Sequence, residues 1–442
     1  MKTVGAFLLF LVLAIAWTWP ARRWPMVFDD LHLVRAYHAA ELAGAWAGHW
    51  DPDGLETPGL RPLSVAFNHV RAVVFGESVI GHRHLLAGLF ALDLALLVPL
   101  ARHVDLGLGG AVAAGLAMLF TRYSAYHLVW ITDGNHLVQG LAFMVSALLL
   151  VDGLATPSRP RLAASLLAIA AGLLVREDTL AALPALALIA FAPTRGRRRL
   201  AAEYAIGLGA LAAMLLAWRR AVVPAAQPLG LDLGGFGRAV LHAFDPVGVD
   251  GFDAASTLLT QGWWAILALT VAALAATGDR AAWRWTARWA AAAVAACTPG
   301  LLLQRDDLLF FPSLFVALML ATAWSAIWDA RPPLRPAVAA AVAWCVLGGA
   351  WMGGLLAENF HPDSARAIDW NTEFLYGRYA SATIPAARRQ GVAAHLEALG
   401  VRAGEQPRQR VRALIVEARE AGRRRPRPDG RVFFPLLPER YF

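Results

Sequence analysis

The sequence predicts an all-α polytopic membrane protein, and three observations lead to that prediction. Hydrophobic residues make up 58% of the 442 residues and charged residues only 16%, which is far from the balance of soluble domains. The mean hydropathy is +0.50. Apolar segments of roughly twenty residues, the length that spans a bilayer, recur along the chain, whereas the alternating segments of a membrane β-barrel are not apparent.

About eleven apolar segments are the expected transmembrane helices. Lipid offers no partners for backbone N–H and C=O groups, so these segments should be helical and should pack through their many Gly and Ala positions. The first could instead be a cleaved signal, since Ala14-Ile15-Ala16 resembles a cleavage site, but its apolar run continues through Trp17 and Trp19. The segments are 4–20, 84–101, 108–122, 136–153, 162–175, 179–193, 200–218, 262–277, 286–303, 308–328 and 336–356.

Two long connections and a polar tail interrupt the apolar pattern. Residues 21–83 are predicted to form an outer loop with amphipathic helices at 30–46 and 64–75, joined by Asp51-Pro52-Asp53-Gly54. Residues 224–261, rich in Gly, Asp and Pro, form a second outer loop. The core is therefore expected to cover 1–356. Residues 357–442 follow as a small polar tail with helical patches at 385–400 and 407–421.

The placement of arginines orients the predicted spans. With Lys2 inside, the opposite short loops hold only Arg122, Arg176 and Arg305, which is the positive-inside pattern. An odd number of spans puts the tail on the outer face, although its arginine-rich end favours the inside. We attribute the net charge of +8 to topology and to anionic membrane lipids, and we expect no nucleic-acid binding. The alternate short loops carry Arg102, Arg159, Arg161, Arg195, Arg197, Arg198, Arg199, Arg280, Arg284, Arg288, Arg331 and Arg335.

This orientation gathers four short acidic motifs on the outer face. Any one of them would ordinarily be a solvated helix cap, but four together, with arginines beside them, favour a water-filled cavity. Arginine binds phosphate oxygens through paired donors, whereas carboxylates bind a divalent cation or accept a proton. We therefore expect a site for a lipid phosphate or pyrophosphate. The motifs are Asp29-Asp30, Asp133 in Thr132-Asp133-Gly134-Asn135-His136, Glu177-Asp178 and Asp306-Asp307, and the arginines are Arg176, Arg305 and Arg219-Arg220.

The polar motifs also follow one another in a distinctive order along the chain. They are the acidic pair after the first span, Arg61-Pro62-Leu63, Gly81-His82-Arg83-His84-Leu85, Trp130-Ile131-Thr132-Asp133, Arg176-Glu177-Asp178 and Gln304-Arg305-Asp306. This order resembles the GT-C superfamily of integral membrane glycosyltransferases, and most closely its protein mannosyltransferase and related bacterial branch. The likeness covers roughly residues 1–355.

The resemblance implies a polyprenyl-phosphate-linked sugar donor, an outer-face acceptor that is a protein, lipid or glycan, and transfer with inversion at the outer side of a bacterial plasma membrane. It assigns catalysis to Asp29 or Asp30. One carboxylate would remove the proton of the acceptor hydroxyl, and the other would orient the acceptor or hold a metal. Arg305 would stabilise the departing phosphate, with Arg219 and Arg220 as a second candidate pair.

Supporting roles are expected for Arg61, Asp133, His136, Glu177 and Asp178, although Arg176-Glu177-Asp178 departs from the Lys-Glu pair of many relatives and leaves the role of Glu177 open. Metal dependence is open as well.

The candidate ligands for Mn²⁺, Mg²⁺ or Zn²⁺ are Asp29, Asp30, Asp133 and His136.

Two other hypotheses compete with the glycosyltransferase. A transporter or flippase for a lipid-linked intermediate would also need arginines and a cavity, and a membrane scaffold without activity would tolerate amides at Asp29 and Asp30.

Overall fold

The computed structural model describes residues 2–416 except 57, 105, 122, 193–196, 224–231, 246–253, 299–309, 358–359, 404–406, 408 and 415. Within these residues every regular element is a helix. Seven helical stretches are long and apolar enough to cross a membrane, which confirms a helical multi-pass membrane protein; the predicted number of about eleven spans stays a prediction. The seven are Lys2–Arg23, Val79–Ala101, Thr132–Ala155, Arg198–Val222, Leu258–Thr277, Phe310–Ala330 and Pro332–Gly354.

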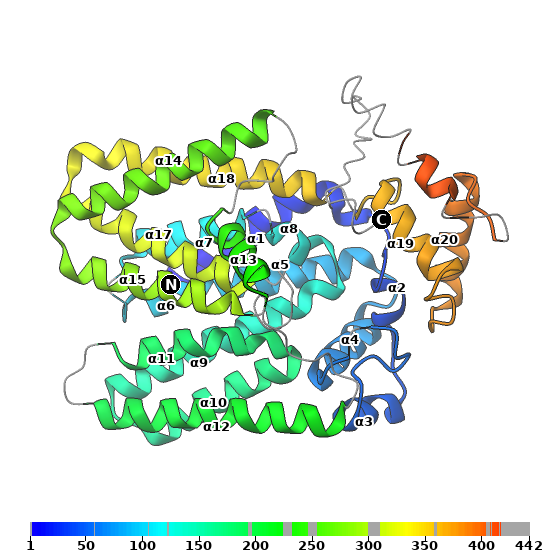
Figure 1. Cartoon of the computed structure of the whole chain (residues 1–442), viewed down its shortest axis with the longest axis horizontal. Coiled ribbons are helices and arrows are strands. Elements are labelled where there is room, and N and C mark those ends of the chain that lie inside the picture. The colour runs from blue at the N-terminus through cyan, green and yellow to red at the C-terminus, as the bar shows by residue number, and fades with distance from the viewer. Residues whose placement is uncertain are drawn as a thin grey trace.

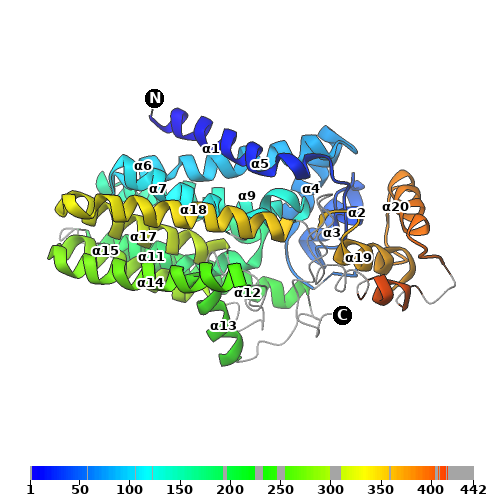
Figure 2. The same ribbon diagram turned by 90° about the horizontal axis from the view of Figure 1, so that it is seen from above.

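The long helices run roughly side by side along the longest axis of the molecule (Figures 1 and 2). They are α1 (Lys2–Thr18), α5 (Val79–Ala95) with α6 (Leu97–Ala101), α9 (Asn135–Ala155), α12 (Arg198–Val222), α14 (Ala254–Thr277), α17 (Phe310–Ala330) and α18 (Arg335–Ala357). Shorter helices occupy the other predicted spans: α7 (Leu108–Leu119), α10 (Arg159–Val175), α11 (Leu183–Ala190) and α15 (Arg280–Ala296).

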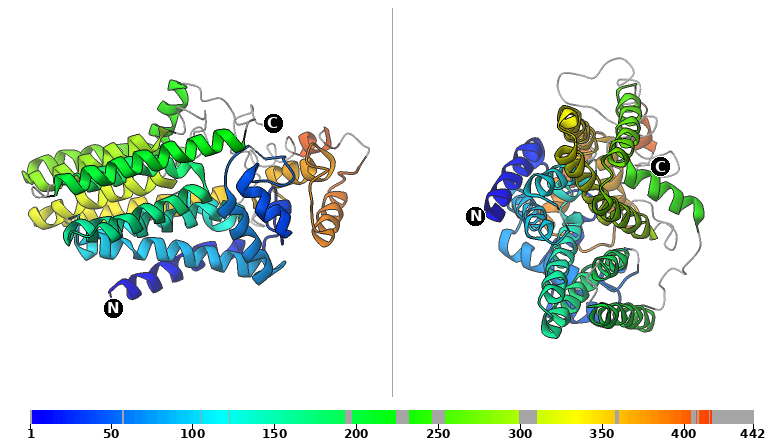
Figure 3. Two further views of the ribbon diagram at one scale, coloured as in Figure 1. Left: turned by 90° about the horizontal axis from the view of Figure 1, so that it is seen from below. Right: turned by 90° about the vertical axis from the view of Figure 1, so that its left-hand side faces the viewer.

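Helix α17 forms the centre of the bundle, and it is buried along almost its whole length. Aromatic rings pack around it, with Phe315 stacked on Trp289 at 6.2 Å between ring centroids and edge-on to Phe143 at 5.5 Å. By contrast only Ala6, Phe10 and Ala14 are buried in α1, which lies at the edge of the bundle (Figure 3). A peripheral helix of this kind suits contact with lipid, as expected for a membrane span.

Small residues allow the helices to approach closely, as the sequence predicted. Gly349 on α18 lies directly against the carbonyl of Phe120, and a β-carbon there would overlap that backbone. Gly115 on α7 likewise receives the ring of Phe10 from α1. Helices in membranes gain little from hydrophobic exclusion, so such close van der Waals packing is an important part of what holds them together.

The first long loop and the tail gather at one end of the bundle, which we call the loop end. It contains α2 (Asp30–Leu33), α3 (Ala39–Ala47), α4 (Pro62–Phe75), α19 (Ala365–Tyr376) and α20 (Ala386–Ala398) (Figures 1 and 2). Leu31 and Val34 from the loop share one hydrophobic cluster with Phe374 and Leu396 from the tail. The two segments therefore fold against each other although more than three hundred residues separate them.

The predicted elements of the loop and tail differ in detail from the structure. The single amphipathic helix expected at 30–46 is divided into α2 and α3, and α19 lies where no helical patch was expected. The second predicted loop contains α13 (Leu233–Phe244) and the start of α14. The remaining short elements are η1 (Trp19–Arg23), α8 (Ser124–Val129), η2 (Thr132–Gly134), η3 (Glu177–Ala182) and η4 (Pro332–Leu334). The patch expected at 407–421 lies partly outside the described residues.

Candidate functional site

Phe28 sets the direction of the chain as it enters the acidic pair. Its φ angle is +59°, in the left-handed region that bulky residues rarely adopt. Such a conformation costs on the order of 1–3 kcal/mol and persists only where its surroundings hold it. Here the Phe28 ring stacks on Trp370 at 4.5 Å, and the Phe28 N–H donates to Asn371 Oδ1 at 3.3 Å. Helix α19 of the tail therefore holds the turn that positions Asp29 and Asp30.

Asp30 is a fixed residue whose two carboxylate oxygens are both occupied. Its Oδ1 accepts hydrogen bonds from the N–H and the hydroxyl of Thr132, at 2.6 and 2.5 Å, and its Oδ2 accepts from the Ile131 N–H at 3.2 Å. The side chain is 1% exposed. Burial raises the pKa of Asp30, and the bonds from Thr132 partly oppose this rise. Asp30 therefore connects the first loop to residues 131–132 through hydrogen bonds.

Asp29 has a different environment, although it is the adjacent residue. Its Oδ1 accepts a hydrogen bond from Trp130 Nε1 at 2.7 Å, and Oδ2 accepts none from the described residues. Burial, followed by the negative charges of Glu56 and Asp30, raises its pKa well above the usual value. A carboxylate with one unbonded oxygen and raised proton affinity has the properties of a general base. The two residues of the predicted pair therefore differ: both oxygens of Asp30 are bonded, whereas one oxygen of Asp29 accepts no hydrogen bond from the described residues.

Two buried arginines support the backbone that holds these carboxylates. Arg71 on α4 donates to the carbonyl of Ile131 at 2.5 Å. Arg83 on α5 donates to the carbonyls of Ala21 and Trp24, both at 2.6 Å, and to that of Val129 at 3.1 Å. They connect the start of the first loop to the segment after α8. Arg83 was noticed within the Gly81–Leu85 motif, whereas Arg71 was missed.

The signal for Arg71 was present in its spacing. Ser64, Asn68 and Arg71 recur at intervals of four and three residues and form a buried polar stripe on α4. An amphipathic helix at an interface would be expected to bury apolar residues on that face. A buried stripe containing an arginine and an asparagine therefore indicates a helix packed against polar backbone.

A second polar network lies next to Trp130. Asp133 contacts two histidines: Oδ2 lies 2.6 Å from His127 Nδ1 and Oδ1 lies 3.2 Å from His136 Nε2. The other His136 nitrogen lies 3.8 Å from Asp178, which pairs with Arg176 at 3.2 Å. Although burial acts in the opposite direction, Arg176 and His136 lower the pKa of Asp178 to about 2. The predicted residues Asp133, His136 and Asp178 thus form one network.

Glu177 faces away from that network and pairs with Arg219. Its Oε1 accepts from Arg219 Nε at 2.6 Å and from the Leu60 N–H at 2.7 Å. The end of α12 is thereby linked to the first loop. Of the predicted phosphate-binding arginines, Arg219 is engaged in this pair and Arg220 is exposed. Arg305 lies outside the described residues.

Arg61 lies close to the Glu177 pair, with its guanidinium over the ring of Trp50 at 5.0 Å from the centroid.

Two cavities lie near the tail, of about 550 and 390 Å³. The larger is lined by Thr372, Glu373 and Tyr376 of α19, and the smaller by residues that include Glu77 and Arg388. Neither is lined by Asp29 or Asp30.

The predicted metal ligands do not form one group in the described residues. No three of Asp29, Asp30, Asp133 and His136 bring their ligand atoms within 4.8 Å of one another in the part of the chain that the structure describes. Among the His, Cys, Asp and Glu side chains that the structure describes, the group whose ligand atoms all lie within 4.8 Å of one another is His32, Asp51 and Asp53.

Comparison with known proteins gives a negative result. No family model, curated protein or solved structure matches this chain. The resemblance to the GT-C superfamily therefore stays a prediction that depends on the residues themselves.

Proposed function

We propose that this protein is a membrane glycosyltransferase that moves a sugar from a polyprenyl-phosphate-linked donor to a hydroxyl of a protein, lipid or glycan acceptor, with inversion. The observation that carries the proposal is Asp29, a residue 7% exposed, with a raised pKa and one carboxylate oxygen that accepts no hydrogen bond from the described residues. A general base works best when its pKa lies near the operating pH. Asp29 also has an oxygen that accepts no hydrogen bond from the described residues and could take a proton, whereas both oxygens of Asp30 are bonded.

The proposed reaction is a single displacement. The acceptor oxygen attacks the anomeric carbon, the bond from that carbon to the phosphate oxygen breaks, and the lipid phosphate leaves with the electron pair. Asp29 takes the proton of the acceptor hydroxyl. Trp130 holds the carboxylate in one orientation through its hydrogen bond, and the Asp133 network lies directly beyond Trp130 in the chain. In this proposal Asp30 positions the loop and takes no proton.

The donor phosphate is proposed to bind arginines at the same end of the bundle, because fixed cations stabilise the charge that develops on a departing phosphate. Arg305 is the first candidate on the basis of the family resemblance. Arg220 is exposed at the end of α12, whereas Arg219 is already paired with Glu177. The arginine asymmetry of the short loops supports about eleven spans, with the loop end on the outer face of a bacterial plasma membrane.

A transporter or flippase of a lipid-linked intermediate is the second candidate, and one observation favours it. Asp93 lies within α5, 4% exposed, and both its carboxylate oxygens lack hydrogen-bond partners in the described chain. An ionisable side chain inside a membrane span is often part of an ion or proton path. The proposal of a transferase instead treats Asp93 as a packing residue beside Gly140 and Phe310.

The test is transfer of radiolabelled sugar in proteoliposomes that contain purified protein, a panel of polyprenyl-phosphate sugars and membrane acceptors. We expect Asp29→Asn to abolish transfer while the protein stays folded, and Arg305→Ala to reduce it. Asp152→Asn, which changes a half-exposed carboxylate on α9, is the matched control and should retain full activity. Equal transfer by wild type and Asp29→Asn would refute the assignment. Movement of intact donor across the bilayer, lost in Asp93→Asn, would favour the flippase.

A further inference from the structure

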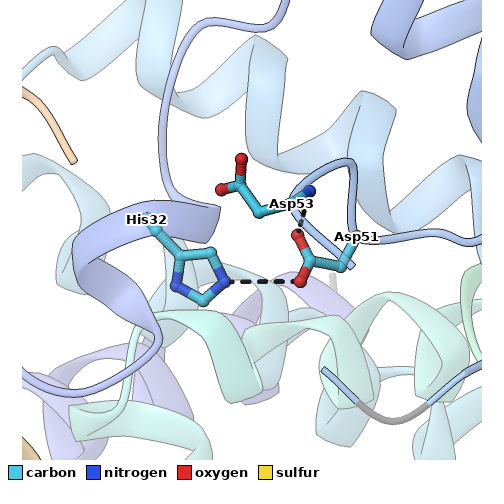
Figure 4. Close-up of side chains that lie close together, drawn as sticks. All are labelled: His32, Asp51 and Asp53. Carbon is cyan, nitrogen blue, oxygen red and sulfur yellow. Dashed lines mark hydrogen bonds and ion pairs between the residues drawn. The ribbon is translucent and has the colours of Figure 1, made fainter. Parts of the chain in front are cut away.

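A second group of ligating side chains lies one helical turn beyond Asp29, in the first loop. His32 on α2 is fully buried, and neither nitrogen of its ring has a hydrogen-bond partner among the residues that the structure describes. Its Nε2 lies 3.7 Å from Asp51 Oδ2 and 3.9 Å from Glu56 Oε1. Figure 4 shows an imidazole nitrogen of His32 directed at the Asp51 carboxylate, with Asp53 in the same turn as Asp51. None of these residues is among the four metal candidates that the sequence predicted.

The turn that supplies the carboxylates is rigid. Asp51 accepts hydrogen bonds from the N–H groups of Asp53, Leu55 and Glu56 at 2.9–3.0 Å. Gly54 adopts a φ of +69°, which a residue with a side chain would tolerate poorly. These backbone donors hold the Asp51 carboxylate in one orientation.

An ordinary buried histidine does not explain this arrangement. A hydrogen bond requires at most about 3.5 Å between donor and acceptor, and both distances from Nε2 exceed that limit. A buried polar group without a partner costs about 1–3 kcal/mol. Glu56 Oε1 is also buried without a hydrogen-bond partner in the described chain. The unpartnered His32 ring therefore faces two carboxylates, those of Asp51 and Glu56.

A shared cation satisfies all three groups at once. Zinc lies about 2.0–2.2 Å from nitrogen and oxygen ligands, so two ligand atoms of a tetrahedral site lie about 3.4 Å apart. The observed 3.7 and 3.9 Å are only a few tenths of an ångström longer, a difference that small side-chain rotations can close. Asp53 completes the set, since its ligand atom lies within 4.8 Å of those of His32 and Asp51.

We infer that His32, Asp51, Asp53 and Glu56 form a binding site for one divalent transition-metal ion. One imidazole with several carboxylates suits Zn²⁺ or Mn²⁺, and Zn²⁺ should bind more tightly because N/O sites generally follow that order. Asp53 also accepts two hydrogen bonds from Thr383, at 2.7 and 3.1 Å, so the site connects the first loop to the tail. The site does not depend on the proposed transferase activity.

The experiment measures metal binding alone, so a failure of the proposed function leaves it unaffected. Full-length protein in detergent is treated with a chelator, dialysed, and titrated with Zn²⁺ by calorimetry and with Co²⁺ by visible absorption. We expect one ion per chain. Loss of a residue that only supports a ligand typically costs 10–100-fold in affinity, so loss of a direct ligand in His32→Gln should weaken Zn²⁺ binding by at least about 100-fold.

A spectroscopic variant separates ligation from a structural role. His32→Cys should still bind Co²⁺ and should gain a thiolate-to-metal charge-transfer band that wild type lacks, because the sulfur would then be a ligand. The control is His103→Gln, which removes another histidine facing a carboxylate, Asp152 at 3.4 Å, and should leave the affinity unchanged.

The inference is overturned if wild type binds no ion at millimolar Zn²⁺. It is also overturned if His32→Gln binds Zn²⁺ as tightly as wild type. Should His32→Gln fail to fold, the inference is overturned if His32→Cys binds as tightly as wild type and shows no new charge-transfer band. Equal loss in His103→Gln would show that any measured binding lies elsewhere.

Discussion

Replacing Asp29 with asparagine should stabilise the folded protein at neutral pH, whereas the same change at Asp30 should destabilise it. The pKa of Asp29 in the folded protein lies well above the ordinary value of 3.8. Ionisation of Asp29 therefore opposes folding. This penalty is absent below pH 3.8, where the carboxyl is protonated in both states, and it grows as the pH rises towards the folded pKa.

The magnitude follows from the contacts of each carboxylate. Each unit by which the pKa of Asp29 is raised lowers the free energy of unfolding by about 1.4 kcal/mol once Asp29 is ionised. Asp29→Asn should recover this loss at pH 7, except for about 1 kcal/mol because the amide accepts a weaker hydrogen bond from Trp130. At Asp30, an amide places an N–H₂ group against one of three donors from residues 131 and 132. That change should cost about 2–5 kcal/mol.

The assay is unfolding of purified protein in detergent at pH 4 and pH 7, for both variants and for Asp152→Asn. Asp29→Asn should unfold at a higher temperature than wild type at pH 7 and at nearly the same temperature at pH 4. Asp152→Asn should change little at either pH. The reasoning is refuted if Asp29→Asn destabilises the protein at pH 7 as strongly as Asp30→Asn does, or if its effect does not vary with pH.

Two further predictions concern the partners of the acidic pair. Trp130→Phe removes the hydrogen bond that lowers the pKa of Asp29, a bond worth about 1.5–3 kcal/mol. The acidic limb of the pH–kcat/KM profile should therefore move up by about one to two pH units. Trp344→Phe, which instead removes an indole hydrogen bond to the Leu259 carbonyl, should not move it. Arg388 on α20 pairs with Glu77 at 2.6 Å and donates to the carbonyls of residues 30 and 31 at 3.1 and 3.2 Å. Arg388→Gln should therefore speed amide hydrogen exchange in α20 and leave exchange in α17 unchanged. Exchange in α20 of the variant that is as slow as in wild type would contradict this role.

The fold was predictable where hydropathy determines it. A long apolar run in a chain this poor in charge must be a helix in lipid, so α1, α5, α9 and α17 were each expected close to their observed positions. Helix α19 was not expected, because Arg366, Asp369 and Glu373 interrupt its pattern. Its apolar residues face a partner that the local sequence cannot reveal, the first loop more than three hundred residues earlier.

The site was predictable only in part, for a related reason. An acidic pair directly after an apolar segment attracted attention by its position alone. The division of roles between Asp29 and Asp30 depends on Trp130 and Thr132, about one hundred residues later, and no local pattern encodes it. His32 gave no signal at all, since its unpartnered ring becomes evident only when the turn at Asp51 is folded against it.

The docking of the tail on the first loop also determines whether the number of membrane crossings is even or odd. Since Arg388 donates to the backbone of residue 30, both segments must lie on the same side of any membrane that the bundle crosses. The chain between them must then cross an even number of times, and with α1 as a span the total must be odd. The same contact has a consequence for biosynthesis. The loop that carries Asp29 leaves the ribosome early, but it cannot reach its final conformation until the last helix has been inserted and the tail has followed it.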